Sequence, residues 1–181
     1  MAPRLEAGTL TLGETFAFLS SLYFRGKLAY AQAFADGAAL PPRVLVITPT
    51  RGLQPPSLPV SRALLQEFGE VDVMSQDVRY RGPLEADTRR LASNLDNGAR
   101  VVLLGSIATG KYIDVLVQEL GDRLYFPLCF VGRGDMSRGG ILLRSAAAGV
   151  ELDYVRVASD ILLMAIGTRM IVGALADLSA M

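Results

Sequence analysis

The chain has 181 residues, the length of one ordinary domain with room for a sizeable core. Its 18 basic and 18 acidic residues balance, so no global charge favours nucleic acid or a membrane surface, and attraction for an anion must come from local clustering. The absence of histidine excludes Ser-His-Asp and Cys-His catalysis and disfavours the usual zinc site, so we expect no metal and no cofactor.

The predicted elements alternate between helices and short apolar runs. Apolar residues at helical spacing predict a helix over 12–35, with Gly26 as the point of a break. A strand follows at 43–47, then a proline-dense loop and a helix at 60–68, with Ser61 or Ser57 near its cap. The remaining predictions are strands at 71–74, 101–104 and 124–131, helices at 83–95, 109–120 and 160–178, and edge or antiparallel strands at 141–144 and 152–157.

Alternating strands and helices are typical of an α/β fold. We therefore predict a single α/β domain over residues 1–181: a three-layer sandwich with a mainly parallel central sheet of about four strands flanked by helices. In such sheets ligands bind in the loops at the carboxyl ends of the strands. Each of the first four predicted strands, at 43–47, 71–74, 101–104 and 124–131, ends in a polar loop that holds glycine or a basic residue.

The loop at 105–111 has the spacing of a Walker A loop and lies between a predicted strand and a predicted helix. Tyr112 stands where that motif needs a Ser or Thr for Mg²⁺, which argues against nucleoside-triphosphate chemistry. Backbone N–H groups at the helix start, the hydroxyls of Ser106 and Thr109, and Lys111 would still suit an anion. The alternative is a tight turn with a solvated lysine.

The stretch 132–140 holds four glycines, which let backbone approach a ligand closely. Arg133 and Arg138 suit a forked grip on phosphate or carboxylate. Asp135 suits the role of orienting an arginine or acting as a base, and Asp77 is a reserve for acid–base work. A flexible hairpin loop is the alternative. In the proline-rich loop Arg51 is the basic candidate, and a stiff structural turn is equally consistent with its composition.

Cys129 is the single cysteine, which excludes an internal disulfide and favours a reducing cytoplasm. It lies in an apolar run, as expected of an inert buried thiol. The first residues show no secretory signal pattern. Segment 161–181 is apolar but carries Arg169 and Asp177, so we expect it to be buried or at an interface rather than in a membrane. A helix at 160–178 that is apolar nearly all round predicts a homo-oligomer.

The order of the pieces Thr48–Pro56, Val101–Lys111 and Gly132–Arg138 is similar to uracil-DNA-glycosylase-like α/β domains, over roughly residues 43–157. That resemblance implies a DNA-gripping loop after the last core strand. The family's water-activating Asp motif is absent from the first loop and its histidine from the last, so glycosylase chemistry does not follow. The segment Leu22–Ala31 also resembles a helix of small bacterial α/β domains of unknown function.

Together these features predict a cytoplasmic protein that binds a phosphate-bearing anion, a nucleotide or nucleic acid, at the carboxyl edge of the sheet. The residues expected to hold the anion are Arg51, Ser106, Thr109, Lys111, Arg133 and Arg138. The alternative is a non-catalytic oligomerising scaffold or protein-interaction domain, which the absence of a recognisable catalytic set favours. Whether the protein is an enzyme is left open by the sequence.

Overall fold

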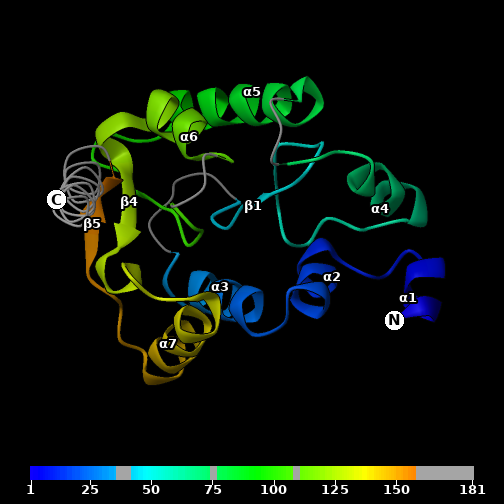
Figure 1. Ribbon diagram of the computed structural model, residues 1–181, viewed down its shortest axis with the longest axis horizontal. Coiled ribbons are helices and arrows are strands. Elements are labelled where there is room, and N and C mark those ends of the chain that lie inside the picture. Colours follow the sequence, from blue (N-terminus) through cyan, green and yellow to red (C-terminus); the bar gives the residue numbers. More distant parts are fainter. Residues whose placement is uncertain (36–41, 74–76, 108–110, 158–181) are drawn as a thin grey trace, which may run out of the picture.

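The computed structural model describes residues 1–35, 42–73, 77–107 and 111–157 (Figure 1). This part of the chain is rich in helix and has two small sheets. Its α-helices are α1 (Ala2–Glu6), α2 (Leu12–Leu19), α3 (Ser21–Phe34), α4 (Arg62–Gly69), α5 (Val78–Asn94), α6 (Ile113–Leu120) and α7 (Asp135–Ala148). Its strands are β1 (Val46–Ile47), β2 (Leu53–Gln54), β3 (Val101–Val102), β4 (Leu124–Pro127) and β5 (Tyr154–Arg156).

The larger sheet has the strand order β3-β4-β5. β4 runs parallel to β3 and antiparallel to β5, while β1 and β2 form a separate antiparallel hairpin. The predicted three-layer sandwich with a mainly parallel sheet of about four strands is therefore wrong. The described residues contain one parallel pair of strands, and β5 is the antiparallel edge strand that the sequence predicted for 152–157.

The first two apolar runs do not join the parallel pair, for local reasons. After β1 the chain turns back at once: the backbone N–H and the hydroxyl of Thr48 both donate to the Gly52 carbonyl, at 2.9 and 3.0 Å. Gly52 adopts a φ of +58°, which glycine accepts without steric cost. The run at 71–74 forms no strand over its described residues, because Val71 and Val73 pack instead against α5.

Two predictions in the C-terminal half are wrong because α7 replaces them. The helix includes the predicted strand 141–144 and most of the predicted loop 132–140. Its buried positions, Arg138, Leu142 and Ser145, recur at intervals of four and three residues, which is the period of a helix face. Gly149 ends the helix with a φ of +64°.

The other helices agree with the sequence to different degrees. α4 confirms the predicted helix and its Ser61 cap, whose hydroxyl accepts from the Leu64 N–H at 3.2 Å. α6 ends at Gly121, as predicted. α5 starts five residues before the predicted start at Pro83, because Asp77 caps it. The predicted helix over 12–35 is two helices that break at Ser20 rather than at Gly26.

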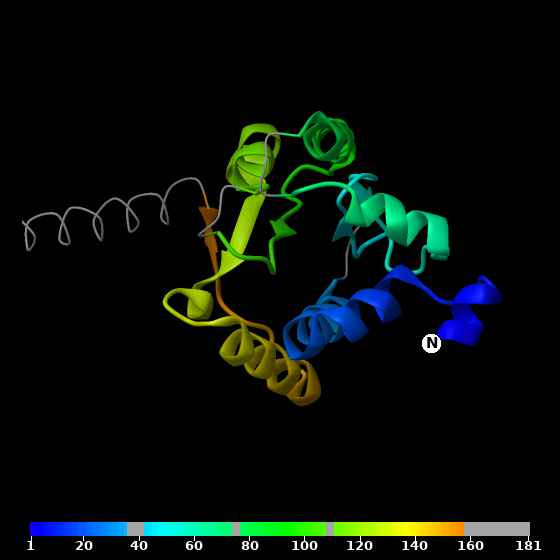
Figure 2. The ribbon, with the colours of Figure 1, turned by 45° about the vertical axis from the view of Figure 1, so that its right-hand side comes forward.

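The described helices form two layers, α5 with α6 on one side and α3 with α7 on the other, and β4 runs from the first layer toward the second (Figures 1 and 2). Ion pairs Arg81–Asp114 and Arg89–Glu119, at 2.9 and 2.8 Å, join α5 to α6. The main core lies between these layers and consists of Tyr23, Tyr30, Leu103, Leu116, Leu120, Leu124, Phe126, Phe130, Leu142 and Val157.

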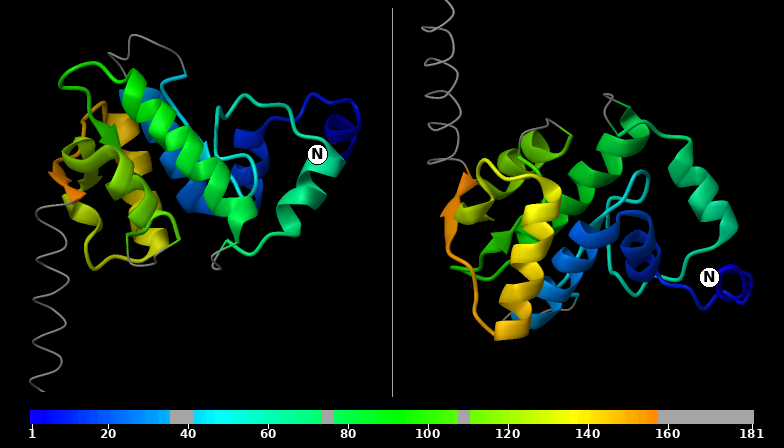
Figure 3. Two further views of the ribbon diagram at one scale, coloured as in Figure 1. Left: turned by 90° about the horizontal axis from the view of Figure 1, so that it is seen from above. Right: turned by 60° about the horizontal axis from the view of Figure 1, so that its bottom comes forward.

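Helices α3 and α7 pack with their backbones in close approach at two glycines (Figure 3). A Cβ added to Gly26 would lie 2.7 Å from the Gly139 carbonyl oxygen, and one added to Gly139 would lie 2.9 Å from the Tyr23 Cα. Only glycine allows helices to cross so closely. This crossing brings the α3 side chains Tyr23 and Lys27 against the first turn of α7.

The predicted helix at 160–178, and with it the predicted oligomerisation through that helix, lies outside the described residues. Among the helices of the described part, none is long and apolar enough to cross a lipid bilayer. The prediction of one domain over 1–181 stays a prediction.

Candidate functional site: a polar cluster where β3 and β4 end

Three segments bring polar side chains together beyond the carboxyl ends of the parallel strands β3 and β4. α3 supplies Tyr23 and Lys27, the segment between β3 and α6 supplies Tyr112 and the backbone of Ser106, and the first turn of α7 supplies Asp135 and Arg138. We call these six residues the edge cluster. β3 leads directly to Ser106, and β4 leads through a short 3-10 turn to α7, so the parallel pairing explains why these two segments meet.

Tyr23 and Lys27 are four residues apart on α3 and therefore share one face of the helix. The Tyr23 hydroxyl donates to the Leu104 carbonyl at 2.9 Å, which ties α3 to the segment after β3. The Lys27 Nζ lies 3.9 Å from the centroid of the Tyr23 ring, a cation–π contact. Among the described residues no carboxylate oxygen lies within 4 Å of this amine, and none of them accepts a hydrogen bond from it.

Arg138 is the buried cation of the edge cluster. Its side chain is 11% exposed, its Nε donates to the Phe130 carbonyl at 3.3 Å, and its guanidinium carbon lies 5.7 Å from the centroid of the Phe130 ring, a cation–π contact. Asp135 lies one turn earlier and is 69% exposed, with 3.6 Å between its carboxylate and the Arg138 guanidinium. Because this ion pair is long and its carboxylate faces solvent, it leaves the Arg138 guanidinium able to take another anion.

Tyr112 closes the cluster from the β3 side. Its hydroxyl lies against the Cα of Gly105, where a Cβ would collide with it, and the backbone of Ser106 is in hydrogen-bonding position to it. Gly105 is therefore required for close approach of the phenol. The predicted Walker-type position thus holds a phenol that faces the cluster in place of a magnesium-binding hydroxyl.

The cluster perturbs the ionisation of its members in a consistent way. Burial lowers the pKa of Lys27 to about 8; the Asp135 charge opposes this shift and the Arg138 charge adds to it. Burial raises the pKa of Tyr23 to about 12, and Arg138 partly offsets this rise. Burial also raises the pKa of Tyr112, with the Ser106 backbone and Arg138 opposing it. The same burial that keeps both phenols protonated, as hydrogen-bond donors, favours the neutral form of the lysine.

The charges of the edge cluster favour an anionic ligand. Lys27 and Arg138 face one carboxylate, that of Asp135, which is mostly in solvent. The Gly134 N-cap of α7 supplies no side-chain hydrogen bond, so the first N–H groups of the helix point outward unsatisfied by a cap. Within the described ranges no group of three or more Cys, Asp or Glu side chains is placed to hold a metal ion.

Three predicted site residues lie in this cluster: Ser106, Asp135 and Arg138. Lys111 is half-buried in the turn next to Tyr112, before α6. Arg133 is exposed in the turn before α7, where its charge acts on the Cys129 thiol. Burial raises the pKa of that partly buried thiol, and the Arg133 charge opposes the rise. Thr109 lies outside the described residues.

The other two predicted residues are engaged elsewhere. Arg51, beside the β1–β2 hairpin, donates from its Nε and an Nη to the two Glu67 carboxylate oxygens, at 2.7 and 2.5 Å. Asp77 caps α5, accepts from the Arg79 N–H at 2.8 Å and pairs with its guanidinium at 2.7 Å. Neither residue is brought to the edge cluster, because α4 and α5 satisfy their charges locally.

Sequence reasoning missed Tyr23, Lys27 and Tyr112 as site residues. Tyr23 has the spacing of a core residue, which it also is, and Lys27 has that of a solvated helix residue. The one available signal was glycine at position 26 inside a helical pattern, since such a glycine often marks close packing.

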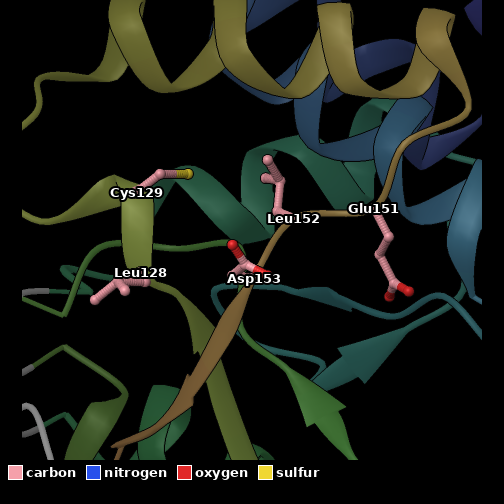
Figure 4. Close-up of a pocket in the computed structure, with 5 residues that line it drawn as sticks. All are labelled: Leu128, Cys129, Glu151, Leu152 and Asp153. Carbon is pink, nitrogen blue, oxygen red and sulfur yellow. The ribbon is translucent and has the colours of Figure 1, made fainter.

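Two hollows of the described surface lie elsewhere. One, of about 270 Å³, is lined by Leu128, Cys129, Glu151, Leu152 and Asp153, and the Glu151 carboxylate points away from the Cys129 thiol (Figure 4). The other, of about 360 Å³, includes Glu67 and Glu70. The lining of the first hollow has two carboxylates and no basic side chain, and that of the second has two carboxylates and one arginine, Arg79, so the edge cluster, with two cations and one carboxylate, suits an anion better.

No protein-family model, no curated protein and no solved structure matches this chain. The resemblance to uracil-DNA-glycosylase-like domains therefore stays a prediction that rests on the order of the sequence segments alone.

Proposed function

We propose that the protein binds a phosphate-bearing small anion at the edge cluster, between the first turn of α7 and Lys27. The observation that carries the proposal is the convergence of the Lys27 ammonium and the Arg138 guanidinium, with no carboxylate of the described residues within 4 Å of the amine. The phenol of Tyr112 and the first N–H groups of α7 add neutral donors that suit phosphate oxygens.

Asp135 supports this proposal because an anion can easily replace it as the partner of Arg138. The carboxylate is 69% exposed and 3.6 Å from the guanidinium, so an arriving phosphate would exchange a weak surface ion pair for a forked contact with Arg138. Asp135 could then serve as the acid–base group. We infer a cytoplasmic setting from the single cysteine, which a reducing compartment suits.

Thermal unfolding at low salt tests the proposal, with inorganic phosphate, adenosine monophosphate, a short oligonucleotide and uncharged adenosine as probes. At a concentration 100 times Kd, a ligand of the native state adds about 2.7 kcal/mol, which is roughly 5–10 °C in Tm for a chain of this size. We expect the phosphate-bearing probes to raise Tm and adenosine to have no effect. Added salt should weaken the response through screening.

Variants locate the binding. Arg138→Gln and Lys27→Gln should lose the Tm response, while Arg144→Gln, an exposed arginine on the same helix, should keep it. Absence of any response at low salt would contradict the proposal. So would loss of the response in Arg144→Gln to the same extent as in Arg138→Gln. A response to the oligonucleotide alone would shift the assignment to nucleic acid.

A second candidate function, an interaction scaffold, is favoured by exposed apolar side chains. Phe18 and Leu19 at the end of α2 are 68% and 67% exposed, and Met136 at the start of α7 is 66% exposed. Light scattering that shows an oligomer in the parent chain, and a monomer in the Phe18→Ser/Leu19→Ser variant, would support this function.

A further inference from the structure

Lys27 is held in an environment that ordinary surface lysines do not share. The chain has two lysines, Lys27 and Lys111. Lys27 is half-buried, and its amine is placed over the Tyr23 ring, 3.9 Å from the centroid, beside the guanidinium of Arg138. A structural lysine so placed would normally be paired with a carboxylate, yet no described carboxylate oxygen lies within 4 Å of its Nζ.

We propose that Lys27 is a reactive amine that forms a reversible imine with an aldehyde- or ketone-bearing anion held by Arg138. The inference rests on the proposed function, because the anionic group is what would hold the carbonyl carbon beside Nζ. It adds the chemical class of the ligand, a carbonyl compound that carries phosphate or carboxylate, and it assigns the lysine a covalent role.

The step balances without an oxidant or reductant. The neutral Nζ attacks the carbonyl carbon, a C–N bond forms, and the carbonyl π pair moves to oxygen; the oxygen takes one proton and the nitrogen releases one, which gives the neutral carbinolamine. A second proton on the hydroxyl lets it leave as water while the nitrogen lone pair forms the C=N bond, and the nitrogen then releases its last proton, which leaves the imine. Tyr112, which burial keeps protonated, is the phenol donor for this oxygen, because the Tyr23 proton is donated to the Leu104 carbonyl, and the Asp135 carboxylate is the nearby proton acceptor.

The electrostatics of the cluster support this chemistry. Burial lowers the pKa of Lys27 to about 8, against 10.5 for an ordinary lysine. At pH 7.5 this raises the neutral fraction of the amine on the order of 100-fold. A less basic amine is also a weaker nucleophile, and that offsets part of the gain, so we expect imine formation roughly 10-fold faster than at an ordinary lysine.

Pyridoxal 5′-phosphate is a suitable probe, because it carries an aldehyde and a phosphate, and pyridoxal is its counterpart without the phosphate. The native chain is incubated with each probe at pH 7.5, treated with borohydride to reduce any imine to a stable secondary amine, and digested for mass spectrometry. We expect the phosphate probe to modify Lys27 roughly 10-fold faster than Lys111. Inorganic phosphate should slow the modification of Lys27 and leave that of Lys111 unchanged.

The variants Lys27→Arg and Arg138→Gln separate the two proposals. Lys27→Arg should lose the adduct, and the Tm response of the parent chain to inorganic phosphate reports on the anion site separately. Modification of Lys27 no faster than of Lys111 would overturn the reactive amine, whatever the phosphate response. Equal modification by pyridoxal and its phosphate, with no protection by inorganic phosphate and no effect of Arg138→Gln, would overturn the anion site and the tethering step with it.

Discussion

Replacing Gly139 with alanine should destabilise the protein, although alanine is the better helix former. The added Cβ would lie 2.9 Å from the Tyr23 Cα and 3.0 Å from the Leu22 carbonyl oxygen, so α3 and α7 would have to move apart by about half an ångström to restore ordinary contact. Because the obstructing atoms are backbone, no rotamer change relieves them. Overpacking of this kind costs roughly 1–3 kcal/mol, and the gain in helix propensity returns about 1 kcal/mol.

The neighbouring Gly140 is a matched control on the same helix. The nearest atom to a Cβ there is an Arg144 guanidinium nitrogen at 3.2 Å, at the end of a flexible side chain. Gly140→Ala should therefore stabilise the protein by roughly 0.5–1 kcal/mol through helix propensity alone. Urea unfolding followed by circular dichroism gives both free energies, with an unchanged m-value as the check on two-state behaviour. Equal effects of the two substitutions, in either direction, would refute the close crossing.

Three further outcomes follow from the contacts above. The pKa of Lys27 is about 8 in the folded state and 10.5 in the unfolded chain, so the unfolded state binds more protons between these values and the free energy of unfolding should rise as the pH goes from 8 to 10.5. Lys27→Met should flatten that rise and increase the free energy of unfolding at pH 7 by on the order of 2 kcal/mol. Urea midpoints measured at each pH test both outcomes. The Arg4 guanidinium and the Thr11 cap lower the pKa of Glu14 from 4.5 to about 2. The ionised carboxylate therefore stabilises the fold above pH 4.5, and this stabilisation is lost as the pH falls through 2. Glu14→Gln should reduce the dependence of Tm on pH between those values. Gly52→Ala should cost more than Gly98→Ala in the same unfolding assay: both glycines have positive φ, but a Cβ on Gly52 would also lie 2.6 Å from the Pro83 carbonyl, whereas one on Gly98 meets nothing within 4 Å.

The sequence predicted best the features that depend on neighbouring residues. The Ser61 cap of α4 and the stop of α6 at Gly121 follow from cap chemistry alone, which acts within one helical turn. The run Ile141–Arg144 shows the limit of such reasoning. Four residues with three apolar side chains fit a buried strand as well as a helix face. In the structure they belong to α7, which packs Leu142 into the main core.

The site was predictable to the extent that it depends on strand order. Ser106 and Arg138 follow β3 and β4, and because these strands are parallel their ends meet. Arg51 follows β1 in the same way, but β1 pairs with β2 in a local hairpin and its loop faces Glu67 of α4. A basic residue after an apolar run therefore marks a shared site only when the run joins the parallel pair.

The contribution of α3 could not be read from the chain, because it depends on one long-range contact. Gly26 and Gly139 are more than a hundred positions apart, and only their backbone approach brings the Lys27 amine beside the Arg138 guanidinium. Each glycine is flanked on its own helix by a residue of the edge cluster, Lys27 next to Gly26 and Arg138 next to Gly139. The small residues that allow the helices to cross therefore also set the separation of the two cations, so the packing of the fold and the charge of the site depend on the same contact.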